Sequence, residues 1–211
     1  MQKINNRGIL TVVSGFAGSG KGTLMKKLLE NYDGYALSVS ATSRSPRPGE
    51  KEGVSYFFKS RSEFEKMIED DGFLEHAEYV GNYYGTPKDF VFSKLDEGFD
   101  VILEIEIQGA MQIKERFPDT LLVFVMPPGA EELKSRLVGR GTETPEIIEK
   151  RMKRAAAESE GIEKYDFIVV NDDIDKCTKQ LHEIIQAAHF TPSHQMEFIQ
   201  EIRKELKKLE G

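Results

Sequence analysis

Short apolar runs alternate with stretches of helical periodicity along most of the chain. Residues 9–14, 101–107, 121–126 and 167–170 are rich in Val, Ile, Leu and Phe, as the buried strands of a parallel sheet are. Between these runs, apolar residues recur every three or four positions, which is the period of an amphipathic helix. This alternation predicts an α/β fold with a mainly parallel central sheet and helices on both faces.

The expected helices follow the strands. The first begins after residue 20, and the others span residues 110–117, 130–138, 145–160 and 174–188. A further strand is expected at 35–39. Between two of these helices, residues 139–145 form a glycine-containing loop that we interpret as mobile and hinged.

The rhythm changes between residues 40 and 90. Residues 40–50 form a polar, proline-rich loop, and a short strand at 56–58 follows. The next expected elements are a helix at 62–70, with Ser62 and Glu65 at capping-box spacing, and a hairpin of residues 74–80 and 83–84 about Gly81-Asn82. Thr86-Pro87 is expected to begin a helix that ends near Gly98. We therefore expect a small α+β insertion here.

The C-terminal segment predicts a separate helix over residues 193–209. Its apolar positions are spaced by three or four residues: Met196, Ile199, Ile202, Leu206 and Leu209. This narrow stripe is similar to a coiled-coil seam. The helix either packs on its own domain or forms a dimer contact, so we expect a monomer or a homodimer.

Composition narrows the classes of protein. The 211 residues suit one larger α/β domain with insertions, and a net charge of −7 argues against general nucleic-acid binding, although it permits a local basic pocket for a small phosphate ligand. The single cysteine, Cys177, excludes an intrachain disulfide and favours a reducing compartment. No signal peptide is visible, and no apolar run approaches the ~20 residues of a membrane span. We expect a soluble, cytoplasmic protein without nucleic-acid or membrane partners.

The strongest motif joins the first strand to the first helix. Gly15-x-x-x-x-Gly20-Lys21 has the spacing and the strand–loop–helix context of a phosphate-binding loop. Glycines allow backbone N–H groups to turn around phosphate oxygens, the helix N-terminus attracts the same anion, and Lys21 adds a full charge. The residues expected to bind the nucleotide here are Gly15, Phe16, Ala17, Gly18, Ser19, Gly20, Lys21, Gly22 and Thr23. The alternative is a structural glycine turn followed by a surface lysine.

The loop departs from the pattern at the position after the lysine. Gly22 stands where a Ser or Thr hydroxyl normally ligates Mg²⁺, and Thr23 comes one residue later. We interpret this as a changed metal arrangement, in which Mg²⁺ accompanies the nucleotide through water and Thr23, and the metal ligands stay unassigned.

The insertion carries a second set of phosphate-binding side chains. Arg44 and Arg47 lie three residues apart beside two prolines, and an arginine fork binds phosphate bidentately. Hydroxyls of Tyr56 and Tyr84 are further candidate donors. Two arginines near a nucleotide loop suggest a second phosphate-bearing ligand. The alternative is a solvated basic loop beside half-buried tyrosines.

An ordered set of short motifs closely resembles those of the guanylate kinase family. The set comprises Ser40-x-Thr42-x-Arg44-x-x-Arg47-x-Gly49-Glu50, Gly53-Val-x-Tyr56-Phe, Phe73-Leu-Glu75, Gly81-Asn-Tyr-Tyr84-Gly-Thr86 and Leu103-Glu-Ile-x-x-Gln108-Gly109. The match covers about residues 9–188. It implies a phosphate-binding loop that holds ATP, a GMP-binding insertion and a lid that closes over both.

The resemblance also implies a division of the chain and a reaction. The core would comprise residues 1–39 and 91–190, with the GMP-binding insertion at 40–90, a lid at 137–150 within the core, and a C-terminal helix at 191–211. The implied reaction transfers the γ-phosphoryl group of ATP to GMP with Mg²⁺, giving ADP and GDP, for GMP recycling and GTP supply in purine metabolism.

Residue roles follow from the resemblance position by position. Arg44, Arg47, Tyr56 and Tyr84 would hold the GMP phosphate, and the residues that would read guanine are Ser40, Glu75, Thr86, Glu104 and Glu106. Asn171 would lie near adenine. The implied catalytic residues are Lys21, Arg44 and the lid-side arginines Arg136, Arg140 and Arg151. Alternatively, Thr86 is only a structural helix cap, and Arg136 only lies on a solvated face of its helix.

Two positions depart from the family pattern. Phe16-Ala17 replaces a common Pro-Ser, where little effect is expected because the backbone binds the phosphate. Glu106 stands where Asp is frequent, and the extra methylene moves its carboxylate by about 1.5 Å. Two other functions stay open: a related kinase of another phosphorylated sugar or nucleotide, and a non-catalytic binding module like those of membrane-associated scaffold proteins.

Overall fold

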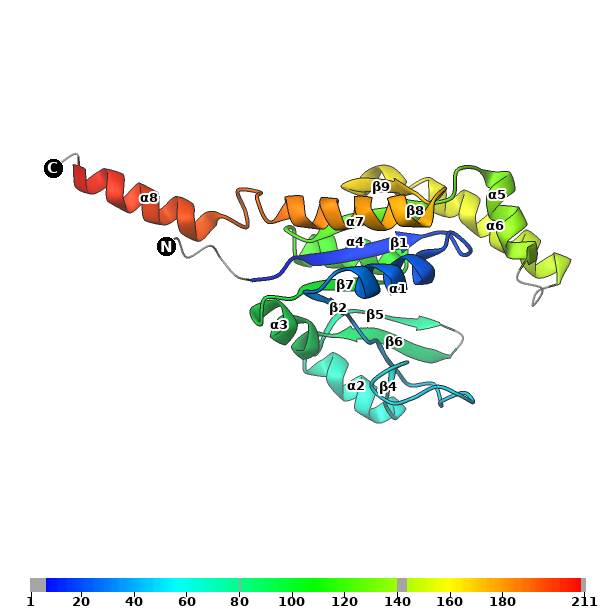
Figure 1. Ribbon diagram of the computed structural model, residues 1–211. Coiled ribbons are helices and arrows are strands. Elements are labelled where there is room, and N and C mark those ends of the chain that lie inside the picture. Colours follow the sequence, from blue (N-terminus) through cyan, green and yellow to red (C-terminus); the bar gives the residue numbers. More distant parts are fainter. Residues whose placement is uncertain (1–6, 80, 140–143, 210–211) are drawn as a thin grey trace.

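The computed structural model describes residues 7–79, 81–139 and 144–209 (Figure 1). Its larger sheet has five parallel strands in the order β2-β7-β1-β8-β9, which confirms the α/β class. These strands are β1 (Leu10–Gly15), β2 (Tyr35–Leu37), β7 (Asp100–Glu104), β8 (Leu121–Met126) and β9 (Phe167–Val170). β1 is therefore the central strand, and the loop that follows it lies at the middle of the sheet edge.

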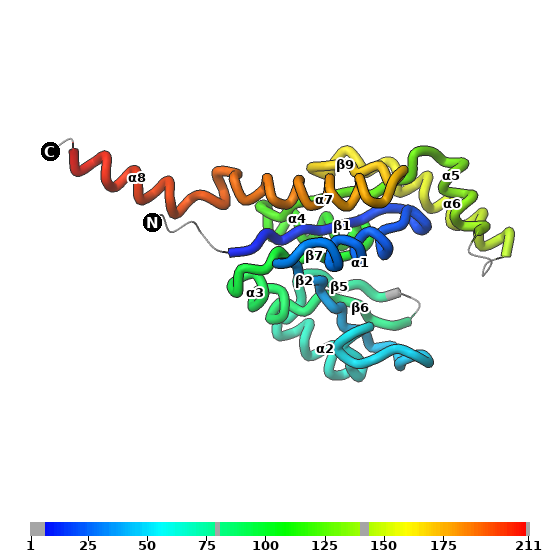
Figure 2. The backbone as a smooth tube through the Cα atoms, in the orientation of Figure 1, coloured from blue at the N-terminus to red at the C-terminus, as the bar shows by residue number. Residues whose placement is uncertain are grey.

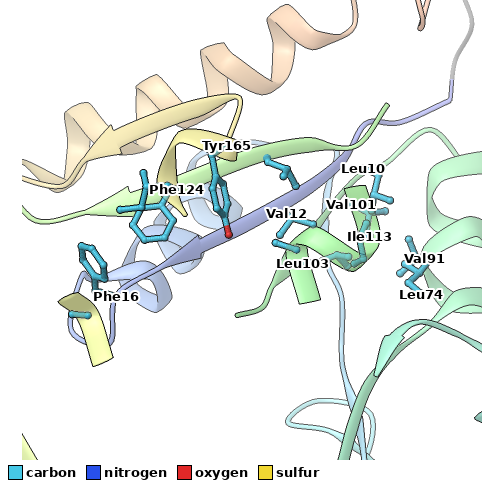
Figure 3. Packing of buried hydrophobic residues seen from close by; sticks show 14 of the residues in the cluster. Leu10, Val12, Phe16, Leu74, Val91, Val101, Leu103, Ile113, Phe124 and Tyr165 are labelled. Atoms are coloured by element: carbon cyan, nitrogen blue, oxygen red, sulfur yellow. The ribbon is translucent and has the colours of Figure 1, made fainter. Parts of the chain in front are cut away.

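Helices cover both faces of this sheet (Figure 1). On one face lie α1 (Lys21–Asn31) and α7 (Ile174–Ala188), and on the other lie α3 (Lys88–Asp96), α4 (Ile107–Arg116), α5 (Ala130–Gly139) and α6 (Pro145–Ser159). A 3-10 turn at Ile162–Lys164 links α6 to β9. Side chains alternate between the two faces: Val12, Leu103 and Phe124 belong to one core (Figure 3), and Val13 and Val123 to the other.

The strand expected at 101–107 is shorter than predicted. β7 pairs with β1 only as far as Glu104, and the prediction of a strand through residue 107 is wrong. Ser14 Oγ donates to the carbonyl oxygen of Ile105 at 2.8 Å, and the chain then turns into α4. Glu106 occupies the N-cap position of that helix with extended backbone, so Glu104 and Glu106 do not share one strand face.

The insertion forms its own four-stranded sheet in the order β4-β3-β6-β5. Its elements are β3 (Ala41–Thr42), β4 (Phe57–Phe58), α2 (Arg61–Glu69), β5 (Phe73–Tyr79) and β6 (Asn82–Pro87). The antiparallel β5–β6 hairpin confirms the sequence prediction. β3 was not expected, because residues 40–50 were interpreted as a loop throughout.

Two helix starts differ from the prediction. α2 begins after a capping box made by Ser60 and Glu63, so the pair Ser62 and Glu65 was the wrong choice of two equally spaced pairs. Thr86 lies within β6 and does not cap α3, because its hydroxyl is used elsewhere and Pro87 takes the N-cap position.

The C-terminal helix α8 (Met196–Leu209) leads away from the rest of the molecule (Figures 1 and 2). Within residues 196–209, no side chain is buried. Across the described part of the chain, no helix is both long enough and apolar enough to cross a membrane.

Candidate functional site

The loop between β1 and α1 is compact and tied to its own backbone. Ser19 N–H donates to the carbonyl oxygen of Phe16 at 3.0 Å, which closes the turn. The ammonium of Lys21 donates to the carbonyl oxygens of Gly15 and Phe16, at 2.5 and 3.2 Å. Phe16 is buried edge-on against Phe124, with ring centroids 5.1 Å apart (Figure 3). The lysine charge is thus held over the loop, where a polyphosphate would gain most from it.

Residues from distant parts of the chain support this loop. Asn171 Nδ2 donates to the carbonyl oxygen of Ser19 at 2.8 Å, and Arg136 Nη2 donates to the carbonyl oxygen of Asn171 at 2.8 Å. Gly20 has a φ of +92°, and a Cβ there would lie 2.3 Å from Asn171 Nδ2. Only glycine satisfies both the backbone angle and the close approach.

A cavity of about 840 Å³ lies where the insertion faces the larger sheet. Six of the predicted site residues line it: Ser40, Tyr56, Glu75, Tyr84, Glu104 and Glu106. Glu104 connects this cavity to the loop. Its side chain reaches solvent at the end of β7, yet the packed atoms around it raise its carboxyl pKa, and the nearby charge of Lys21 partly offsets that rise. The cavity and the phosphate-binding loop therefore adjoin.

Glu75 presents a carboxylate to this cavity from β5. Thr86, across the hairpin on β6, donates its hydroxyl to Glu75 Oε1 at 2.7 Å. Burial raises the pKa of the Glu75 carboxyl, and the bonds from Thr86 lower it by less. A Cβ at Gly109 would lie 3.1 Å from the other oxygen, Oε2, so the glycine gives this carboxylate its space. A half-buried acceptor held in this way can recognise a donor edge of a ligand.

Arg44 lies at the other side of the insertion, beside two tyrosines. Its guanidinium carbon is 5.5 Å from the ring centre of Tyr56, and the Tyr56 and Tyr84 rings are 6.1 Å apart. Arg44 Nη2 donates to both carboxylate oxygens of Glu50, at 2.8 and 3.0 Å. The structure thus brings together Arg44, Tyr56 and Tyr84 as a candidate phosphate site. Arg47 contributes its backbone N–H to Glu50, and its side chain is exposed.

Comparison with known proteins decides the family. A family model described as guanylate kinase matches residues 7–188. The guanylate kinase of Halalkalibacterium halodurans is 52% identical over 183 residues, which cover 87% of this chain and 90% of the relative. That of Caldanaerobacter subterraneus subsp. tengcongensis is 47% identical over 202 residues, which cover 96% and 98%. The chain belongs to the guanylate kinase family of enzymes.

The fold agrees with this assignment to the guanylate kinase family. A crystal structure of guanylate kinase from Anaplasma phagocytophilum superposes with a TM-score of 0.69 and is 35% identical, with 88% of each chain covered. Sequence and structure therefore point to the same family over the same extent of the chain.

The predicted arginines of the guanylate kinase lid fall in different places. Arg136 lies on α5 and is half-buried against the phosphate-binding loop, where its Nη1 also donates to Ser19 O at 3.4 Å. Arg136 therefore does not lie on a solvated face of its helix, which was the alternative interpretation. Arg151 lies half-buried on α6. Arg140 lies outside the described residues, as do residues 141–143 of the expected 137–150 lid. The roles of these arginines stay predictions.

Two residues at the site received no role from the sequence. Arg154 lines the cavity, and its Nη2 donates to Glu106 at 2.9 Å. Its spacing of three residues from Arg151, which places both on one side of a helix, was an available signal. Glu50, which binds Arg44, was part of the family motif but gave no other signal. Such partners become visible only when the three-dimensional contacts are known, because the sequence alone does not show which side chains pair.

Proposed function

We propose that this protein transfers the γ-phosphoryl group of ATP to GMP and produces ADP and GDP, in the cytoplasm, for GMP recycling and GTP supply. The observation that carries the proposal is the half-buried, Thr86-bonded carboxylate of Glu75 in a cavity beside the phosphate-binding loop. Membership of the guanylate kinase family supports the same substrates.

Guanine is the base whose edge suits Glu75. Its N1–H and N2–H₂ groups are donors, and an ionised carboxylate only accepts. Adenine presents a lone pair at N1, which a carboxylate repels. A site built for hydrogen bonds rejects the wrong partner strongly, by ~10⁴ or more where buried groups would be left unpaired. Ser40, Thr86, Glu104 and Glu106 are proposed as the other groups around the base and its ribose.

Phosphoryl transfer here needs alignment more than base catalysis. A phosphate oxygen of GMP attacks the γ-phosphorus of ATP, and the bond to the β–γ bridging oxygen breaks, with ADP as the leaving group. That attacking oxygen is largely ionised at pH 7, because the second phosphate pKa is about 6, so no strong general base is required. Lys21 and Arg44 are proposed to hold the two phosphates in line and to neutralise their charge. Arg136, Arg140 and Arg151 are proposed on the lid side.

Magnesium is proposed as the metal that arrives with ATP. Among the described residues, no three His, Cys, Asp or Glu side chains form a group that would hold a metal by themselves. Mg²⁺ commonly keeps several waters and takes its other ligands from substrate phosphates and one or two side chains, so the exposed Thr23 fits such a role. When bound, the metal would neutralise charge that develops on the β- and γ-phosphate oxygens.

The test is a coupled assay of ADP release with ATP and Mg²⁺. GMP, AMP, CMP and UMP are offered in parallel to the wild type and to Glu75→Gln, with Glu78→Gln as a matched control, since Glu78 lines the same cavity from the same strand. We expect turnover with GMP alone, a loss of at least a hundredfold in kcat/KM in Glu75→Gln, and little change in Glu78→Gln.

Other results would redirect the proposal. Equal turnover of several nucleotides would keep the kinase but contradict guanine recognition by Glu75. No turnover with any of them, despite ATP binding, would favour a related kinase of another phosphorylated sugar. Loss of ATP binding as well would favour a non-catalytic binding module.

A further inference from the structure

Glu50 is at the centre of the loop that carries both arginines of the insertion. Its carboxylate accepts Arg44 Nη2 with both oxygens, and its Oε2 also accepts the backbone N–H of Arg47 at 2.7 Å. The backbone N–H of Glu50 donates to the carbonyl oxygen of Arg47 at 3.1 Å, and Gly49 between them has a φ of +89°. One carboxylate therefore folds the loop and fixes the arginine.

We propose that Glu50 is a positioning residue, which holds the Arg44 guanidinium where it binds the phosphate of the nucleoside monophosphate. The proposal rests on the proposed function, because it concerns the same substrate. It gives a role to a residue that had none from the sequence motifs or from the lining of the cavity.

The opposite role must be weighed, because a carboxylate beside an arginine can compete with a phosphate for the same donors. Arginine carries five N–H donors. Glu50 uses Nη2, and the carbonyl oxygen of Ser45 accepts Nη1 at 2.8 Å. Tyr84 also hydrogen-bonds the Arg44 side chain, and the Nε–H and the second Nη1–H lie on different edges of the guanidinium, so they can meet a ligand only as single donors. Glu50 thus holds the Nη2 end of the guanidinium, and the phosphate would be met by donors that Glu50 does not use.

The cost of losing this partner is conformational. A long, flexible arginine side chain loses rotamer entropy when it is ordered. The side chains of Arg44 and Glu50 are only 13% and 21% exposed, so the pair is already ordered beneath the loop. The Tyr56 ring, 5.5 Å from the guanidinium, bounds the other side. Without Glu50, the guanidinium would have to be ordered by the substrate itself, which weakens binding.

The experiment compares two ligands that differ only in the phosphate. GMP and guanosine are titrated calorimetrically, without ATP, into the full-length wild type, Glu50→Ala and Glu50→Gln. Glu52→Gln is the matched control, because this variant loses the same charge two residues away. Among the described bonds of Glu52, its carboxylate accepts only the backbone N–H of Phe58. We expect about tenfold to a hundredfold weaker GMP binding in Glu50→Ala, as for a lost charged hydrogen bond, with unchanged guanosine binding. Glu50→Gln, which keeps one acceptor oxygen, should fall between, and Glu52→Gln should match the wild type.

A double-mutant cycle with Arg44→Ala distinguishes positioning from a direct effect of charge. If Glu50 acts through Arg44, Glu50→Gln has no further effect on GMP affinity once Arg44 is gone. Glu50→Gln is also the variant that keeps the test valid if Glu50→Ala does not fold.

Three outcomes would overturn the role of Glu50: tighter GMP binding in the Glu50 variants, which would make Glu50 a competitor; equal losses for GMP and guanosine, which would make it purely structural; or no loss at all. These readouts need no catalysis. Absence of GMP turnover by the wild type would therefore overturn the proposed function separately, in the assay described above.

Discussion

Two glutamates of the site have opposite electrostatic environments. Burial raises the pKa of the Glu75 carboxyl above its ordinary value of 4.5, whereas Arg44 and the backbone N–H of Arg47 lower the pKa of Glu50 below it. The consequences for stability therefore have opposite signs. Because its pKa is lowered, Glu50 stabilises the folded state at pH values above its unfolded pKa, and this stabilisation is lost as the pH falls through the folded pKa. Because its pKa is raised, the stability that Glu75 contributes is fully present below its unfolded pKa and is lost as the pH rises through the folded pKa.

Glu75→Gln should therefore stabilise the protein at neutral pH while it abolishes guanine recognition. The variant removes a half-buried carboxylate whose charged form burial disfavours, but keeps an oxygen that accepts the Thr86 hydroxyl. Removal of a destabilising functional group commonly gains ~0.5–2 kcal/mol, and about 2–4 °C in Tm per kcal/mol is typical for this chain length. The gain over wild type should grow as the pH rises above the ordinary carboxyl pKa of 4.5, which a series of thermal unfolding measurements from acid to neutral pH checks.

Glu78→Gln is the control for this pH series, and its Tm should follow that of the wild type at every pH. A Tm difference between Glu75→Gln and wild type that stays constant with pH would contradict the assigned role of burial.

At the scale of elements, the sequence pattern predicts the bounds well where an apolar run is continuous or a helical period is strong. β8, β9 and α7 have the predicted bounds, because continuous apolar runs or a strong helical period leave one solution. β3 was missed because it has only two residues, and its strand character comes from partners in β4 and β6. The early end of β7 depends on the Ser14 bond to Ile105, which links residues 91 positions apart.

The candidate site was predictable to a similar degree. The family motifs brought Glu75, Thr86, Arg44 and Tyr84 into one prediction, and the structure does place Thr86 on Glu75. The role of Thr86 as a helix cap was a local interpretation that a cross-strand bond overrides. Contacts such as Arg154 with Glu106 join α6 to the start of α4, 48 residues apart, and no local pattern encodes them.

The start of α2 offers a direct test of the two capping boxes. Ser60 Oγ accepts the backbone N–H of Glu63, and we expect Ser60→Ala to lower the free energy of unfolding by about 0.5–2 kcal/mol. Ser62→Ala, the cap that the sequence suggested, should cost less than about 0.5 kcal/mol, as an exposed position usually does. Urea unfolding of both variants is the measurement. Equal costs would contradict the observed cap.

At the scale of the whole molecule, the two sheets face each other across the cavity, and the C-terminal helix α8 extends away from both. Arg116 on α4 donates to the carbonyl oxygens of Phe73 and Leu74, at 3.0 and 2.9 Å, and so ties the insertion to the core. α8 has no such tie. Ile202, Leu206 and Leu209 on its apolar side are 39%, 57% and 83% exposed. The structure therefore does not support the alternative that this helix packs on its own domain.

We expect α8 to pair with the α8 of a second copy. Acidic residues lie toward its start, at Glu197 and Glu201, and basic residues predominate toward its end, at Lys207 and Lys208. Antiparallel pairing would bring opposite charges together over the apolar stripe. The measurement is the molar mass of the full-length protein in solution by light scattering.

Leu206→Glu should lower this mass, because it places a charge in the stripe. Gln200→Glu is the control, since it adds the same charge at an exposed polar position and should leave the mass unchanged. A full-length protein that is monomeric at every concentration would contradict the pairing.

The bond between Asn171 and Ser19 has a consequence for how the protein is made. The two residues are 152 positions apart, so at ~5–20 residues per second a ribosome needs about 8–30 s to supply the second after the first. β1 also waits for both of its neighbours, β7 and β8, which are translated long after it. The first strand to emerge is thus an unpaired apolar segment for much of translation. The nucleotide loop gains its support only when the chain is nearly complete, which postpones nucleotide binding until the rest of the enzyme exists.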